Sequence, residues 1–189
     1  LTLNLVSVKN FGEIEFWFAM IKIVAIVALI IVGGGMVAIG FTSPSGAQAS
    51  VANLWNDGGM FPNHLIGFLG AFQIAVFAFM GSELVGTTAA ETKDPEKTLP
   101  KAINAVPVRV MVFYVGALAT ILMVTPWRLV SPDKSPFVAM FTLAGLGIAA
   151  HIINFVVITS ATSSANSGIF STSRMAFGLA RERSAPQFL

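Results

Sequence analysis

The chain has 189 residues, of which 55% are hydrophobic and only 11% are charged, and its formal net charge is +2. Soluble domains carry about 25% charged residues, so this composition excludes an ordinary soluble globular domain. Cysteine is absent, which excludes a disulfide framework, a thiolate nucleophile and a cysteine metal site.

Four apolar runs are long enough to cross the hydrocarbon core of a membrane, which takes about 20 helical residues. They cover about residues 16–41, 65–90, 108–124 and 137–158. The last run changes at Thr159 into a tract of small and polar residues, which we interpret as a packed helix continuing toward Met175. Residues 42–64, 91–107 and 125–136 are the predicted joining segments. The predicted fold class is an all-α integral membrane protein.

The distribution of lysine and arginine predicts the orientation of these spans. If the spans alternate in direction, one side holds both ends of the chain and the second joining segment, with nine of the eleven basic residues. These nine are Lys9, Lys22, Lys93, Lys97, Lys101, Arg109, Arg174, Arg181 and Arg183. Basic residues are enriched on the cytoplasmic side, so both ends are predicted in the cytoplasm and the protein in the cytoplasmic membrane. The basic excess therefore reflects loop topology, and nucleic acid is not an expected partner.

Two ionisable side chains interrupt the apolar runs, Lys22 in the first and Glu83 in the second. A charge at membrane depth costs about 2.5–3.5 kcal/mol on insertion scales, so such a group is a functional hypothesis by default. Lys22 follows Phe16 by six residues, a depth from which a lysine can also snorkel to the interface. The functional alternative is a desolvated amine that gains and loses a proton. Together the two residues suggest a polar pathway for transport.

Gly81 and Ser82 interrupt the second run just before Glu83. Glycine lowers helix stability by about 1 kcal/mol relative to alanine. A helix broken here exposes main-chain groups to an internal cavity, as in transporters that bind their ligand near the membrane midplane. An intact helix in which Gly81 permits tight packing fits the spacing equally well.

The sequence has no constellation typical of an enzyme or of a cofactor site. His64 and His151 are far apart, and neither is a good base for the serine-rich tract 160–173. The three glycines at 33–35 lack the lysine of a phosphate-binding loop. We therefore expect no enzyme, no cofactor and no metal. Ser160, Ser163 and Ser164 are candidates for a substrate pathway, although such hydroxyls commonly bond to their own helix backbone.

Three motifs carry a resemblance to a known family. FAFMGSELVGTTAAETKDPEKTLPKAIN resembles the sixth membrane helix and following loop of amino acid permeases of the amino acid–polyamine–organocation superfamily. FWFAMIKIVAIV is similar to their fifth helix, and ANSGIFSTSRMAFGLARE to the cytoplasmic end of their eighth. The resemblance covers residues 1–189 and implies helices five to eight of twelve in an inverted-repeat, LeuT-like transporter fold. We therefore expect helices 1–4 and 9–12 on the same polypeptide.

The resemblance implies a substrate site in an unwound sixth helix. The substrate-binding residues carried onto this sequence are Phe77, Ala78, Phe79, Met80 and Gly81. The carbonyl groups of Phe77, Ala78 and Met80 would receive the α-ammonium group of an amino acid. The aromatic ring of Phe77 would gate the site, and Gly81 would allow the unwinding.

The resemblance also implies the activity and its coupling. Lys22 matches a lysine thought to couple transport to protons, and Glu83 matches an acidic position tied to proton dependence in some relatives. The implied activity is proton-coupled uptake of small neutral amino acids such as D-serine, D-alanine and glycine. Aromatic amino acids or GABA are the alternative substrates. A channel or a non-transporting membrane subunit is the alternative class of protein.

Overall fold

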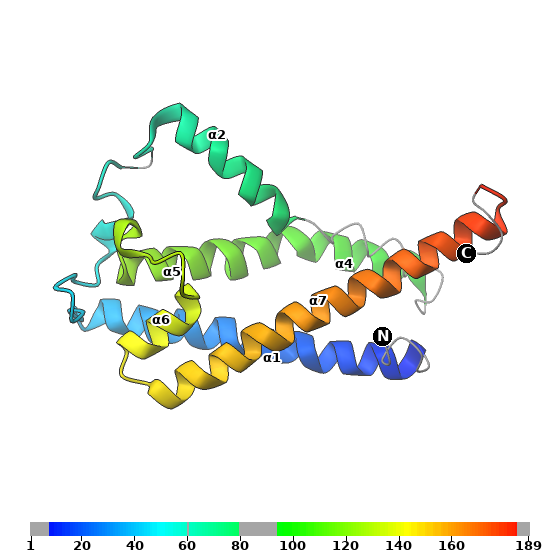
Figure 1. Ribbon diagram of the computed structural model, residues 1–189, viewed down its shortest axis with the longest axis horizontal. Coiled ribbons are helices and arrows are strands. Elements are labelled where there is room, and N and C mark those ends of the chain that lie inside the picture. The colour runs from blue at the N-terminus through cyan, green and yellow to red at the C-terminus, as the bar shows by residue number, and fades with distance from the viewer. Residues whose placement is uncertain (1–7, 60, 80–93, 185–189) are drawn as a thin grey trace. The chain divides into compact units, whose positions relative to one another are not determined.

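The computed structural model describes residues 8–59, 61–79 and 94–184, and the structural statements below concern these residues. They form helices joined by loops, with one isolated antiparallel bridge between Thr42 and Gln48 (Figure 1). In chain order, the α-helices are α1 (Val8–Ala38), α2 (His64–Ala75), α4 (Pro95–Arg109), α5 (Ala117–Val124), α6 (Pro136–Leu143) and α7 (Gly147–Arg181). The 3₁₀ turns are η2 (Val51–Leu54), η3 (Val76–Ala78) and η6 (Trp127–Leu129), and η5 (Val110–Gly116) is a π-helix.

Three helical stretches of the described chain are long and apolar enough to cross a membrane. They are Gly12–Ala38, Pro95–Val124 and Gly147–Arg181. At 1.5 Å per residue, the 27 residues of the first extend about 40 Å, more than the hydrocarbon core requires. The predicted all-α membrane fold class is confirmed.

The third predicted span begins much earlier than residue 108. Helical structure starts at Pro95 and continues through α4, η5 and α5 to Val124, so most of the predicted joining segment 91–107 is helical. Proline is favourable at the first helical position, and Glu96 in the first turn complements the helix dipole. Pro107 lies inside the helix, where it has no amide hydrogen to donate, and the wider π-helical turns of η5 follow it.

The fourth predicted span, 137–158, is divided into two helices. α6 ends at Leu143, and Gly145 has a φ of 75°, in the left-handed region that favours glycine. Gly145 donates its amide hydrogen to the Thr142 carbonyl and Leu146 donates to the Phe141 carbonyl, which is the Schellman arrangement at a helix end. α7 then starts at Gly147 and includes the small-residue tract 159–173.

The second predicted span is described only in its first half. α2 runs from His64 to Ala75, and the chain tightens into the 3₁₀ turn η3 over Val76–Ala78. The predicted continuation to residue 90 lies in the stretch 80–93, outside the described residues.

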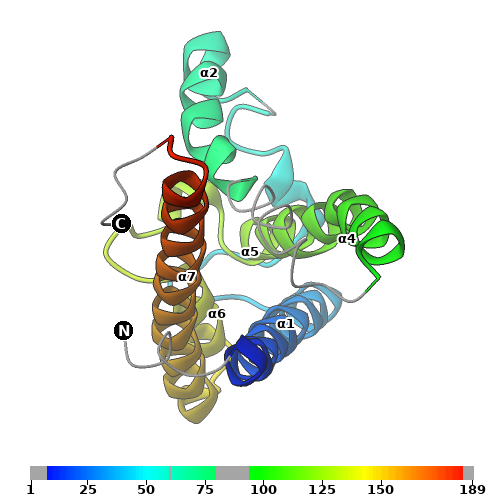
Figure 2. The same cartoon turned by 90° about the vertical axis from the view of Figure 1, so that its right-hand side faces the viewer.

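The chain divides into two compact units. Unit 1 consists of Leu1–Met20, Gly81–Val106 and Ile158–Leu189, and unit 2 of Ile21–Met80 and Pro107–Val157. Unit 1 thus contains the beginning of α1, most of α4 and the larger part of α7. The first residues of α1 and α4 and the last residues of α7 face the viewer in Figure 2. Unit 2 contains the apolar core, in which Leu29, Val124 and Met140 are almost completely buried.

Close packing in unit 2 depends on Gly33 of α1. A Cβ atom at this position would overlap the methyl group of Thr120 on α5 and approach the Met140 sulfur on α6 to 3.1 Å. Thr120 is itself fixed, because its hydroxyl donates a 2.7 Å hydrogen bond to the Gly116 carbonyl. Gly33 therefore lets three helices approach each other, as small residues do between membrane helices.

We predict that Gly33→Ala lowers the free energy of unfolding of the full-length protein by about 1–3 kcal/mol, the usual cost of overpacking. The matched control is Gly34→Ala, because a Cβ at Gly34 has no neighbour within 4 Å. This control should be neutral or slightly stabilising, since alanine is the better helix former. Thermal unfolding of both variants in detergent tests the difference, and equal midpoints would contradict the packing argument.

Candidate functional site

Lys22 lies on the packed face of α1. In unit 2, Ala25, Leu29, Gly33 and Met36 form the buried stripe of this helix, with spacings of three and four residues. Lys22 is half-buried and precedes Ala25 by three residues, so it continues the same stripe. An ionisable group in a membrane helix is expected to face the interior of the bundle rather than lipid. Lys22 is therefore placed at the end of the packed stripe of α1.

The predicted substrate segment is described from Phe77 to Phe79. The α-helix ends at Ala75, and the amide of Phe79 donates a 3.0 Å hydrogen bond to the Val76 carbonyl, a 3₁₀ bond. The ring of Phe77 is 69% exposed within the described chain. Three other predicted site residues, Met80, Gly81 and Glu83, fall in the stretch 80–93, of which the structure gives no description.

The three candidate serines of α7 differ in their surroundings. Ser163 is only 2% exposed, Ser160 is half-buried and Ser164 is exposed. The buried face of α7 in unit 1 continues through Asn166, which is 7% exposed, and Ser171. The buried residues of α7 described in this unit are therefore mainly polar, with Ala180 as the apolar one.

The partner of this polar face is Glu15 of α1, a residue of the same unit. The Ser163 hydroxyl donates a 2.6 Å hydrogen bond to the Glu15 Oε2 atom. The Asn166 side-chain amide donates a 3.3 Å bond to Oε1. Both carboxylate oxygens accept a hydrogen from α7, because Ser163 and Asn166 are three residues apart and share one side of that helix. We call Glu15, Ser163 and Asn166 the carboxylate clamp.

Sequence analysis missed Glu15. The segment GEIEF carries two carboxylates, Glu13 and Glu15, at the start of the first apolar run. Residues two apart point to different sides of a helix, and only Glu15 is on the packed side. A usable signal was present, because Glu15 precedes Lys22 by seven residues, which is almost two helical turns.

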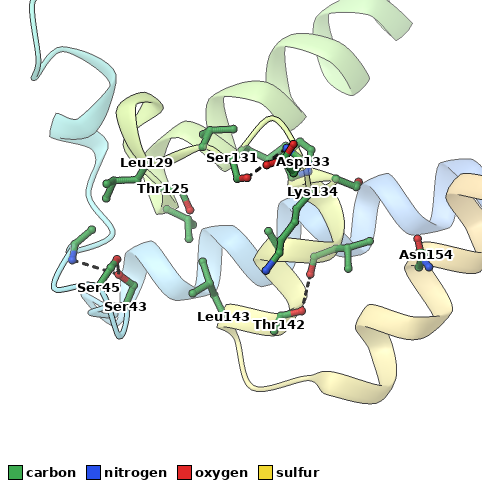
Figure 3. Close-up of a pocket in the computed structure, with 18 residues that line it drawn as sticks. Ser43, Ser45, Thr125, Leu129, Ser131, Asp133, Lys134, Thr142, Leu143 and Asn154 are labelled. Carbon is green, nitrogen blue, oxygen red and sulfur yellow. Dashed lines mark hydrogen bonds between the residues drawn. The ribbon is translucent and has the colours of Figure 1, made fainter.

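A cavity of about 650 Å³ lies in unit 2 (Figure 3), and its lining includes none of the predicted site residues that the structure describes. Hydroxyl groups of Ser43, Ser45, Thr125 and Thr142 contribute to its lining. Figure 3 shows Lys134 extending across the cavity toward Leu143 and Thr142. The 3₁₀ turn η2 is attached to the end of α5, since the Asn53 side chain donates a 2.8 Å hydrogen bond to the Met123 carbonyl.

The described residues contain no group of three or more histidine, cysteine, aspartate or glutamate side chains that could hold a metal ion. What the described chain does contain is long apolar helices that carry ionisable residues on their packed faces. These features define the class as a multi-pass membrane protein with polar groups inside its helix bundle.

Comparison with known proteins gives the family. The family model for amino acid permeases matches residues 1–189, so the chain belongs to the amino acid permease family. This family membership implies the LeuT-like fold.

Several named relatives are similar over nearly the whole chain. The D-serine/D-alanine/glycine transporter of Escherichia coli (strain K12) is 69% identical over 187 residues, which are 99% of this chain and 40% of the relative. The amino-acid permease AapA of Bacillus subtilis (strain 168) is 56% identical over 189 residues, 100% of this chain and 41% of the relative. The aromatic amino acid transport protein AroP of Escherichia coli (strain K12) is 47% identical over 187 residues, 99% of this chain and 40% of the relative.

The chain thus spans about 40% of the length of these relatives. No solved structure matches the chain at the required significance.

The carboxylate clamp predicts that Glu15 contributes more to the free energy of unfolding than its neighbour Glu13. Glu15→Ala removes both acceptors from donors that are buried, so it should lower the free energy of unfolding by about 1–3 kcal/mol. Glu13→Ala is the matched control, because Glu13 is exposed on the same turn, and its effect should stay within about 0.5 kcal/mol. Thermal unfolding of the full-length protein measures both, and equal losses would contradict the clamp.

Proposed function

We propose that the full-length protein is a secondary active transporter that takes up small neutral amino acids together with protons across the cytoplasmic membrane. D-serine, D-alanine and glycine are the proposed substrates. The observation that carries this proposal is the difference in identity between relatives. The relative named for D-serine, D-alanine and glycine is 69% identical, whereas the relative named for aromatic amino acids is 47% identical over the same length.

The proposed substrate site is the segment Phe77, Ala78, Phe79, Met80 and Gly81. It is supported by the end of the α-helix at Ala75 and the 3₁₀ turn that follows. The last carbonyl groups of a helix have no intrahelical partner and can accept hydrogen bonds from a ligand's ammonium group. Discontinuous helices hold substrates in this way in other transporters. The exposed ring of Phe77 is the proposed gate.

The proposed coupling residues are Lys22 and Glu83. Lys22 is supported by its position on the packed stripe of α1, directly before the buried residues Ala25 and Leu29. Gain and loss of a proton by a side chain inside the bundle changes the charge of that region, which can bias the populations of two conformations. Ser160, Ser163 and Ser164 stay candidates for the substrate pathway.

We infer the following arrangement in the membrane. Both ends of the chain and the second joining segment are cytoplasmic, and residues 1–189 are helices five to eight of a twelve-helix domain. The positive-inside rule supports the orientation, as does the composition of unit 1, which combines the beginning of α1, most of α4 and the end of α7. The remaining partners are the lipid bilayer and helices 1–4 and 9–12.

We predict that vesicles with the full-length protein accumulate labelled glycine or D-alanine when an inward proton gradient is applied. Lys22→Ala should abolish the response to the gradient, because its amine is the proposed proton carrier. Lys101→Ala is the control, since Lys101 is an exposed lysine of α4, and it should keep gradient-driven uptake. A correctly inserted Lys22→Ala protein with normal coupled uptake would make Lys22 a snorkelling residue.

Competition tests the substrate class. Unlabelled D-serine, D-alanine and glycine should each reduce the uptake of labelled glycine at concentrations near the KM, and phenylalanine or GABA should not. Uptake of phenylalanine or GABA alone would keep the transporter and replace the substrate. Flux that never saturates and ignores protons would indicate a channel instead. Variants of Lys22 and Glu83 that change only assembly would indicate a packing subunit.

A further inference from the structure

The carboxylate clamp has a different character from the other helix contacts. In unit 2, helices meet through apolar side chains such as Leu29, Met140 and Val124. In unit 1, α1 and α7 meet through a carboxylate and two neutral donors, at 2.6 Å and 3.3 Å. A hydrogen bond to an ionised carboxylate is stronger than one between neutral groups, and it also demands a defined geometry.

The depth of Glu15 makes such a contact reversible. Glu15 directly precedes Phe16, where the predicted first apolar run begins, so it lies at the end of that run. Water can reach this depth when the two helices separate, and it then replaces the hydrogen bonds that are lost. A carboxylate in the middle of the hydrocarbon core would have no such replacement, so a clamp there would stay closed.

We propose that Glu15 is a positioning residue that latches α7 to α1, and that this latch opens and closes during the transport cycle. The inference rests on the proposed function, because it assigns the motion to a transporter. Ser163 and Asn166 act as the matching half of the latch. According to the proposed orientation Glu15 lies near the cytoplasmic end of α1, so opening of the latch admits water from that side.

A buried reporter measures the opening. Ser171 is 5% exposed in unit 1 and follows Ser163 by eight residues on α7, so labelling of a cysteine at this position requires part of unit 1 to open. Residues 1–189 contain no cysteine. The experiment follows the rate at which a water-soluble maleimide labels Ser171→Cys in the full-length protein, in a background without other cysteines.

Weakening the latch should accelerate labelling. We expect Ser163→Ala to be labelled roughly 10-fold faster than the parent, the factor that corresponds to loss of one hydrogen bond to a charged group. Thr162→Ala is the matched control, because the Thr162 hydroxyl bonds at 3.0 Å to the Ile158 carbonyl of its own helix. It removes a hydroxyl from the adjacent position of α7 and should leave the rate unchanged.

A second variant keeps the test decisive if Ser163→Ala folds poorly. Glu15→Gln preserves the shape of the side chain but replaces one acceptor oxygen by a donor, and it should also increase the labelling rate. Maximal uptake should change in both latch variants, whereas the order in which amino acids compete should not. Equal labelling of the parent, Ser163→Ala and Glu15→Gln, in folded protein, would overturn the latch.

The labelling experiment tests the latch separately from the proposed transport function. Labelling needs no substrate, so faster labelling in the latch variants supports the moving contact even if the parent takes up no amino acid. In that case the proposed transport is wrong and the motion belongs to another activity. Uptake of glycine by the parent with equal labelling of all variants would keep the transporter and remove the latch.

Discussion

Hydrogen bonding of polar groups inside apolar helices is the constraint on which this structure depends. In hydrocarbon, an unpaired polar group costs several kcal/mol, so helices that carry such groups must supply partners for them. The Thr120 hydroxyl meets this requirement within its own helix, through the Gly116 carbonyl. Glu15 meets it between helices, through Ser163 and Asn166 of α7. The first solution joins no two helices by a hydrogen bond, whereas the second fixes which face of α7 meets α1.

The two units use opposite means to hold helices together. In unit 2 the absence of a side chain at Gly33 brings α1 against Thr120 and Met140, and shape decides the contact. Apolar packing of this kind tolerates little change, because protein interiors are close-packed. In unit 1 charge and hydrogen-bond geometry decide how the helices meet. Water near the membrane surface can replace these hydrogen bonds. Rigid contacts are therefore expected from apolar and small residues, and reversible contacts from polar and charged residues.

The sequence predicted the helical class well, because an unbroken apolar run of more than 20 residues leaves few alternatives. It placed the third span's start too late, since Pro100 and Pro107 look like helix ends but are tolerated within a helix that begins at Pro95. The break at Gly145 was missed because the residues around it are as apolar as the helices they separate. Hydropathy alone does not reveal a left-handed glycine.

The site was predictable only where a single residue stood out. Lys22 was identified because a lysine within an aliphatic run is conspicuous, and its position on the stripe of Ala25 and Leu29 agrees with a role inside the bundle. Glu15 escaped notice beside Glu13, since the choice between them depends on which side of α1 meets α7, a tertiary fact. The small residues of α7 had suggested close packing or a substrate pathway. The structure adds a further reason for them, because a hydroxyl and an amide placed three residues apart are what a carboxylate on a neighbouring helix needs.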